Sequence, residues 1–218
     1  MIIGFAGKAA TGKTTVARHL EATLDMPTTI LPMAKVLRDE VEAFLCSIDA
    51  QEFVPLVYGD QEDKVRVFYV DATKAHAICP VWESFVTENQ EIQDKPGQTA
   101  VTVRRILQWW GTEYRRAQDP DYWTKAWGRE VDALVQSDRL VLVDDVRFIN
   151  ELNVIRAHGG LIVKIERPGF DGANNHSSET SLDDYSRWDG RIVNDGTIAQ
   201  LGAEAEKLVA TLLKGAEA

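Results

Sequence analysis

The chain has 218 residues, of which 24 are Lys or Arg and 34 are Asp or Glu, so its formal net charge is −10. This length favours one domain with an inserted lobe, and 44% hydrophobic with 27% charged residues excludes collagen-like, coiled-coil and extensively disordered chains. The acidic excess argues against a nucleic-acid-binding or anionic-membrane-binding coat, because such surfaces use clustered Lys and Arg.

The sequence also indicates a cytoplasmic protein. Cys46 and Cys79 are far apart and show no metal-ligand spacing, so we expect two reduced core thiols and no disulfide framework or zinc knuckle. No 18 apolar residues run together and no basic leader is present, so neither a signal peptide nor a membrane-spanning helix is expected.

The N-terminal segment predicts a strand, a loop and a helix. Residues 2–6 form a short apolar run that stops at Gly7, which is typical of a buried parallel strand. Apolar residues at three- and four-residue spacing then predict a helix over residues 13–24. A second strand is expected at 28–31, followed by a helix from about Met33.

The middle of the chain is harder to interpret. Residues 47–100 mix apolar fragments with acidic stretches and show no clear periodicity. A helical pattern returns at Val101, stops near Gly111 or Pro120, and resumes over residues 123–135. We therefore expect two helices after residue 100.

The C-terminal part predicts an alternation of strands and helices. Residues 139–145 are an uninterrupted apolar run ending in two carboxylates, and such a central strand should present its C-terminal end to a ligand. Residues 168–189 are too polar for a core and long enough for a mobile flap. Further elements are expected at 150–158 (helix), 161–165 (strand), 191–194 (strand) and 198–213 (helix). Together these imply a three-layer α/β domain with a mostly parallel sheet.

Residues 7–14 contain a motif that predicts phosphate binding. Gly-Lys-Ala-Ala-Thr-Gly-Lys-Thr at residues 7–14 fits the phosphate-loop pattern G-x-x-x-x-G-K-[ST], after a strand and before a helix as that motif requires. Backbone N–H groups and the helix N-terminus would hold a phosphate, Lys13 would add a full charge, and Thr14 would ligate Mg²⁺. The expected ATP-binding residues are Gly7, Ala10, Gly12, Lys13, Thr14 and Thr15.

Acidic residues follow the central strand. A carboxylate at this edge would meet the magnesium ion or its waters, and a solvated strand end is the less favoured alternative for Asp144 and Asp145. The residues alone do not decide which of the two acts.

Two pairs of adjacent arginines occur in this acidic chain. The pairs Arg104–Arg105 and Arg115–Arg116 would suit phosphate oxygens, although solvated helix faces explain them equally well. Arg167 follows a buried strand and opens the polar flap, where a lid arginine would close on the transferred phosphate. Core packing is the default for the six tryptophans, and stacking of Trp109, Trp110 or Tyr114 on a base is the alternative.

Four motifs in order resemble those of the deoxynucleoside monophosphate kinases of large DNA bacteriophages, a branch of the phosphate-loop nucleoside monophosphate kinase superfamily. They are residues 4–15, Arg-Ile-Leu-Gln-Trp-Trp-Gly-Thr-Glu at 105–113, Asp-Val-Arg-Phe-Ile-Asn-Glu at 145–151, and Arg167-Pro with His176-Ser-Ser-Glu179. The resemblance implies transfer of the γ-phosphoryl of ATP, with Mg²⁺, to a deoxynucleoside 5′-monophosphate. It also implies a P-loop kinase fold over residues 1–218, with 47–118 as an acceptor-binding helical lobe and 167–189 as a lid.

The resemblance assigns roles to individual residues. Lys13, Asp145, Arg147 and Arg167 would be catalytic, and Thr14 with Asp145 would hold the metal. Residues near the acceptor or its lid would be Arg105, Gln108, Trp109, Gly111, Thr112, Glu113, Asp145, Glu151, His176 and Glu179. For a phage-encoded protein the compartment would be the host cytoplasm.

Other functions stay open at this point. Another small-molecule kinase of the dephospho-coenzyme-A or shikimate type has the same loop, and so does a nucleotide-hydrolysing switch protein. A nucleic-acid end kinase would need a basic groove, which a net charge of −10 disfavours. The accepted base is not defined by the sequence, and a homodimer is compatible with it.

Overall fold

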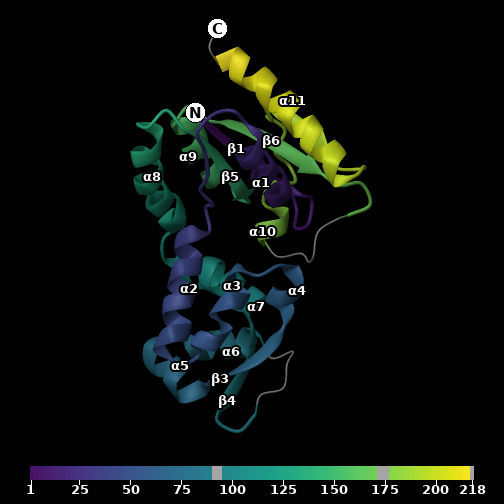
Figure 1. Cartoon of the computed structure of the whole chain (residues 1–218). Helices are drawn as coiled ribbons and strands as arrows, with labels where there is room; N and C mark the ends of the chain where they lie inside the picture. The colour runs from purple at the N-terminus through teal and green to yellow at the C-terminus, as the bar shows by residue number, and fades with distance from the viewer. Residues whose placement is uncertain (90–94, 171–176, 217–218) are drawn as a thin grey trace. The chain divides into compact units, whose positions relative to one another are not determined.

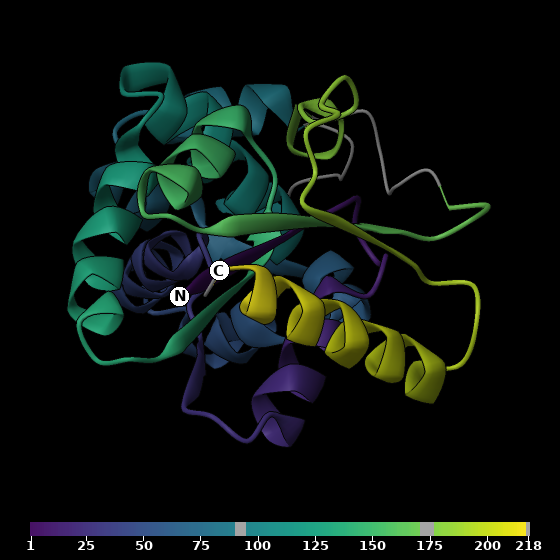
Figure 2. The same ribbon diagram turned by 90° about the horizontal axis from the view of Figure 1, so that it is seen from above.

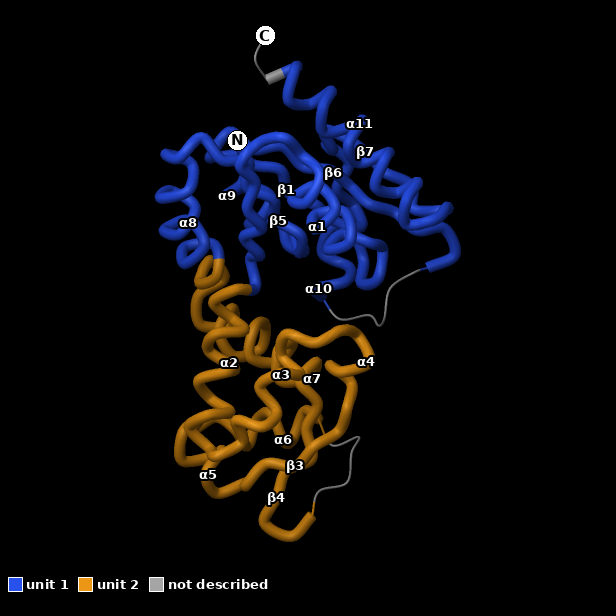
Figure 3. Tube along the Cα trace, viewed as in Figure 1, with its two compact units in different colours: residues 1–34, 124–218 blue, residues 35–123 orange. Residues whose placement is uncertain are grey.

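The computed structural model describes residues 1–89, 95–170 and 177–216. The chain divides into two compact units: Met1–Ala34 with Thr124–Ala218 form unit 1, and Lys35–Trp123 form unit 2 (Figure 3). Unit 2 contains the expected lobe of residues 47–118 but begins earlier, at Lys35.

Unit 1 contains a five-stranded sheet in which every pair of neighbouring strands is parallel (Figure 1). The strand order is β2-β5-β1-β6-β7. The strands are β1 (Ile2–Ala6), β2 (Thr28–Ile30), β5 (Leu140–Val146), β6 (Leu161–Glu166) and β7 (Gly190–Val193). All five residues of β1 are buried, because this strand lies at the centre with β5 and β6 on either side. The sequence prediction of a parallel sheet is confirmed.

Helices cover both faces of this sheet (Figure 2). On one face lie α1 (Lys13–Thr23) and α11 (Ile198–Ala216), which form a core with residues such as Phe5 and Val163. On the other face lie α9 (Ile149–Ala157) and the unit-1 part of α8 (Tyr122–Val135), whose Trp127 and Val131 are buried there. The three-layer α/β arrangement is therefore confirmed.

In the described residues of the segment predicted as a flap, 168–170 and 177–189, there is one short helix, α10 (Ser177–Thr180). It belongs to unit 1. His176, to which the sequence analysis gave a role, lies outside the described residues.

Unit 2 is built from short elements around an aromatic core. Phe44, Trp82, Phe85, Trp109 and Trp110 lie in ring contact within it, with centroid distances of 4.3–6.3 Å. Its elements are α2 (Lys35–Ser47), a 3-10 turn η1 (Gln51–Phe53), α3 (Val54–Tyr58), α4 (Gln61–Val65), β3 (Val67–Asp71), α5 (Ala72–Ile78), α6 (Trp82–Glu88), β4 (Gln98–Thr102), α7 (Val103–Trp109) and a π-helical turn η2 (Trp110–Arg116).

Three sequence-based expectations need correction here. The helix expected from Val101 begins at Val103, because β4 pairs antiparallel with β3 up to Thr102. Of the two predicted ends of this helix, Gly111 is wrong and Asp119-Pro120 is confirmed, because the helix continues through the π-helical turn η2 to residue 118. The Gly111 carbonyl accepts a bond from Trp123 Nε1 at 2.9 Å. Cys46 is exposed and is not a core thiol.

Candidate active site

The phosphate loop joins β1 to α1 and depends on glycine at both ends. Gly7 has φ +147° and Gly12 has φ +106°, and Ala10 between them is also left-handed at φ +58°. A Cβ atom at Gly7 would lie 2.3 Å from the carbonyl oxygen of Ile165, so only glycine lets the loop pass the end of β6. The loop therefore turns back sharply before α1 begins at Lys13.

Neighbouring strands fix this loop. Asn194, which follows β7, donates from Nδ2 to the carbonyl of Thr11 at 2.9 Å. Arg167, which follows β6, lies with Nη1 3.4 Å from the carbonyl of Ala10. Sequence analysis missed Asn194, although a polar residue at the end of the last predicted strand was a usable signal. Residues at the ends of β6 and β7 therefore fix the backbone of the phosphate loop.

Lys13 points back into the loop. Its Nζ donates to the carbonyl oxygens of Gly7 and Lys8, both at 2.7 Å, and the residue is only 6% exposed. Burial, assisted by the nearby Arg147 guanidinium, lowers the pKa of Lys13 to about 7, although carboxylates around it oppose this shift. The ammonium group is thus poorly compensated, and a bound phosphate would favour its charged form.

The two acids at the end of β5 have different contacts. Thr14 Oγ1 donates to Asp144 Oδ2 at 2.6 Å. Asp144 is 6% exposed, and its Oδ1 is buried without a hydrogen-bond partner among the described residues. A buried carboxylate oxygen next to a threonine hydroxyl matches the oxygen ligands that Mg²⁺ takes, so these two side chains fit this metal.

Asp145 faces the end of β2 instead. Its Oδ1 accepts a bond from the Met33 N–H at 2.7 Å, and its Oδ2 accepts one from the Ala34 N–H at 3.0 Å. Asp145 therefore holds the last residues of unit 1 before the chain enters unit 2 at Lys35.

Glu151 stabilises the turn that follows β5. Its carboxylate accepts bonds from the backbone N–H groups of Arg147 at 2.7 Å and Phe148 at 3.1 Å, and the residue is 3% exposed. A glutamate in the first turn of α9 that bonds back to the preceding N–H is a capping arrangement. The structure thus places Glu151 beneath Arg147, in a buried role distinct from the substrate contact that the sequence suggested.

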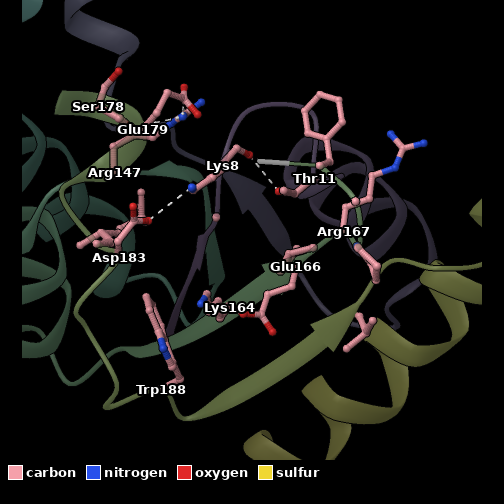
Figure 4. A pocket seen from close by; sticks show the side chains of 18 residues that line it. Lys8, Thr11, Arg147, Lys164, Glu166, Arg167, Ser178, Glu179, Asp183 and Trp188 are labelled. Carbon is pink, nitrogen blue, oxygen red and sulfur yellow. Dashed lines mark hydrogen bonds and ion pairs between the residues drawn. The ribbon is translucent and has the colours of Figure 1, made fainter. Parts of the chain in front are cut away.

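Glu179 lies against the phosphate loop, as sticks show in Figure 4. Its Oε2 accepts a bond from the Ala9 N–H at 2.7 Å, and its Oε1 pairs with Arg147 Nη1. Arg147 also lies 3.3 Å from the carbonyl of Ser178. The motifs at 7–14 and 145–151 and the described residues 177–179 are therefore brought together within unit 1.

A pocket of about 400 Å³ adjoins these groups (Figure 4). The phosphate loop, the ends of β5 and β6, and the segments 167–170 and 178–188 contribute to its lining. Charged side chains of both signs face it, among them Lys8, Arg147, Arg167 and Glu179. The pocket lies wholly within unit 1.

The remaining predicted residues lie in unit 2 on α7 and η2. Trp109 is 4% exposed in the aromatic core, which favours packing over base stacking. Arg105 donates from Nη1 to the Asn89 carbonyl at 3.3 Å. Gly111 is buried, Gln108 and Thr112 are partly buried, and Glu113 is exposed.

Sequence analysis also missed a partly buried carboxylate in unit 2, whose side chain is 19% exposed. Glu40 of α2 accepts bonds from Trp110 Nε1 at 2.8 Å, Arg115 Nε at 2.8 Å and the Tyr122 hydroxyl at 2.5 Å. The Arg115 guanidinium stacks on Tyr114 and Tyr122, with centroid distances of 4.7 and 5.1 Å. No motif marked Glu40, because an acid within an amphipathic helix normally faces solvent.

The parallel sheet, the helices on both faces and the phosphate loop at the end of the central strand define a P-loop kinase fold. A family model described as "Deoxynucleotide monophosphate kinase" matches residues 56–204. The chain belongs to this family. Within its described residues, no helix has both the length and the apolar content needed to cross a membrane.

Two relatives carry the same description. A protein of Acanthamoeba polyphaga mimivirus, named "Putative deoxynucleotide monophosphate kinase", is 27% identical over 211 residues, which cover 92% of this chain and 91% of that protein. The "Deoxynucleotide monophosphate kinase" of Escherichia phage RB69 is 28% identical over 110 residues, covering 50% of this chain and 45% of that protein. The resemblance inferred from four short motifs is confirmed.

Proposed function

We propose that the protein transfers the γ-phosphoryl group of ATP to a deoxynucleoside 5′-monophosphate and so makes the deoxynucleoside diphosphate. The observation that carries this proposal is the complete phosphate loop, with buried Lys13, next to Asp144 at the end of β5, in a chain of the deoxynucleotide monophosphate kinase family. Such a reaction needs no covalent enzyme intermediate, because an oxygen of the acceptor phosphate is itself a nucleophile.

The phosphate loop binds the donor in this mechanism. Its backbone N–H groups and the N-terminus of α1 hold the β- and γ-phosphates, and Lys13 leaves the carbonyls of Gly7 and Lys8 to bind phosphate oxygens. Arg147 and Arg167 stabilise the charge on the phosphoryl group as it moves, since this transfer is catalysed mostly by positioning and electrostatics.

Thr14 and Asp144 hold Mg²⁺ in this proposal. The bound ion supplies the positive charge that neutralises the β- and γ-phosphate oxygens. Their 2.6 Å contact and the unpartnered buried Oδ1 of Asp144 support Asp144 over Asp145, whose two oxygens accept bonds from Met33 and Ala34.

Unit 2 recognises the acceptor in this proposal, through α7 and η2 with Arg105, Gln108 and Glu113. Residues 167–189 act as the lid. The partners are free nucleotides in the cytoplasm, and the formal net charge of −10 supports this choice over a nucleic-acid strand.

The test is a coupled assay of ADP formation from Mg·ATP. The acceptors are dAMP, dGMP, dCMP, dTMP, a 5-modified dCMP and the matching ribonucleotides, with shikimate and dephospho-coenzyme A as alternatives. We expect acceptor-dependent turnover with a deoxy preference. Hydrolysis without any acceptor would favour a switch protein, and turnover with shikimate or dephospho-coenzyme A alone would favour another kinase.

Variants locate the activity in the loop. Lys13→Ala should lower kcat/KM about a thousandfold or more, because a full charge in a water-poor site is lost. Lys207→Ala is the matched control, since Lys207 is an exposed lysine on α11. Asp144→Asn should weaken the response to Mg²⁺ more than Asp145→Asn does, and the reverse order would return the metal to Asp145.

A further inference from the structure

The phosphate loop holds an anionic side chain from the chain itself. The Glu179 carboxylate accepts the Ala9 N–H at 2.7 Å and pairs through its other oxygen with Arg147. Ala9 is the third residue of the loop, between Gly7 and Gly12. A backbone N–H of this loop and a neighbouring guanidinium are the donors that a phosphoryl oxygen requires.

This contact is built into the fold. The Glu179 side chain is 6% exposed and the Arg147 side chain 23% exposed, so water screens the pair only weakly. Glu151 fixes the backbone of Arg147 from below, and Ser178 lies against the same guanidinium. Glu179 lies on α10, and its carboxylate is held in place by the Ala9 N–H of the phosphate loop and by Arg147 of the turn after β5.

We propose that Glu179 is a resident competitor of the donor phosphate, an inference that rests on the proposed function. In the nucleotide-free enzyme its carboxylate takes the hydrogen bond and the guanidinium that a polyphosphate oxygen needs. One N–H cannot donate a full bond to two acceptors, and two anions at that distance repel each other. Donor binding therefore expels Glu179 and releases Arg147 for the phosphate.

A consequence for α10 follows. Glu179 is one of the contacts that hold α10 to the loop, so phosphate in the loop should loosen residues 177–180. Residues 182–188 stay in place, because Leu182, Tyr185 and Trp188 pack against the core of unit 1. The alternative is that Glu179 stays in place and helps to order the lid over bound nucleotide. The two roles predict opposite changes in affinity for the donor when Glu179 is replaced. Removing a competitor strengthens donor binding, whereas removing an ordering residue weakens it.

The test measures binding to the full chain by isothermal titration calorimetry. The probe is inorganic tripolyphosphate, which has no base or sugar, and ATP is titrated in parallel. Glu179→Gln keeps the shape of the side chain and removes its charge, and we expect its Kd for both ligands to fall about tenfold below the wild-type value.

A matched variant distinguishes the loss of the Glu179 contacts from the loss of one negative charge near the site. Asp184→Asn makes the same charge change in the same segment, but Asp184 is exposed, and we expect its Kd to change less than about twofold. Glu179→Asp keeps the charge on a shorter side chain that cannot span Ala9 and Arg147 together. It should also bind more tightly than wild type, by less than Glu179→Gln does.

A second measurement follows the wild-type chain and needs no variant to fold. Hydrogen exchange in residues 177–180 should accelerate when tripolyphosphate is added, whereas exchange in residues 182–188 should change little because this part packs against the core of unit 1. Unchanged or weaker binding by Glu179→Gln, or slower exchange in residues 177–180 on ligand addition, would overturn the proposal. A wild-type chain that binds neither ATP nor tripolyphosphate would instead refute the proposed function, so the two failures are distinguishable.

Discussion

Glu151 offers a strong test of how the site is supported. Its carboxylate accepts two backbone bonds, from Arg147 and Phe148, and the residue is only 3% exposed. Glu151→Ala leaves both N–H groups without this acceptor. Since an unsatisfied buried donor costs about 1–3 kcal/mol, we expect the free energy of unfolding to fall by about 2–5 kcal/mol.

Differential scanning calorimetry can measure this loss. For a chain of this length, each kcal/mol corresponds to about 2–4 °C, so Tm should fall by about 4–20 °C. Glu151→Gln retains an amide oxygen that can accept one or both bonds, and it should lose less than half as much. The kcat/KM value should follow the same order, because the backbone of Arg147 loses its support.

Two results would refute this reasoning. One is a Glu151→Ala variant within about 0.5 kcal/mol of wild type, which is the range of ordinary surface substitutions. The other is a Glu151→Gln variant with wild-type Tm and greatly reduced kcat/KM, which would indicate direct contact between Glu151 and the acceptor.

Three further predictions concern the loop, unit 2 and the cysteines. Gly7→Ala should abolish ATP binding measured by calorimetry, because its Cβ would lie 2.3 Å from the Ile165 carbonyl oxygen; wild-type affinity would contradict the loop geometry. Glu40→Ala should lower the free energy of unfolding by about 1–3 kcal/mol in urea titration, since it removes the shared acceptor of three partly buried donors, and a smaller loss than that of Glu42→Ala would contradict this. Iodoacetamide at pH 8 should modify exposed Cys46 before Cys79, because burial raises the pKa of the Cys79 thiol and leaves less thiolate; mass spectrometry that finds Cys79 labelled first would be inconsistent with it.

The sheet of unit 1 could be predicted because its central strands are short continuous apolar runs and its long helices repeat apolar residues every three or four positions. The fully apolar β1 and the run at 139–145 lie within a residue of their predicted positions. The phosphate loop was also predictable, since its glycine spacing is a backbone requirement that leaves a direct trace in the sequence.

Unit 2 was less predictable for physical reasons. Its helices α3 to α7 have five to seven residues, which is fewer than two turns and too short for a helical period to stand out. The antiparallel pair β3 and β4 is separated by two helices in sequence, so no hairpin turn marked it. Tertiary packing of the aromatic core decides these elements.

The site residues were predictable as a group but not one by one. Motifs place Asp144 and Asp145 at the same sheet edge, whereas only coordinates show that one contacts Thr14 and the other contacts Met33. Burial is equally invisible in a motif, which is why Trp109 was expected near the substrate although its ring is in the core. Proximity along a sequence does not define the direction of a side chain.

The insertion of unit 2 has a consequence for synthesis on the ribosome. β1 pairs with β5 and β6, and β5 begins only at Leu140. At about 5–20 residues per second, the apolar strand β1 waits about 10–30 s for its partners, while the continuous segment Lys35–Trp123 is already complete. We therefore expect unit 2 to complete its fold before unit 1 does. A released chain that ended before Leu140 would contain every residue of unit 2 and a phosphate-loop strand without β5 or β6 to pair with.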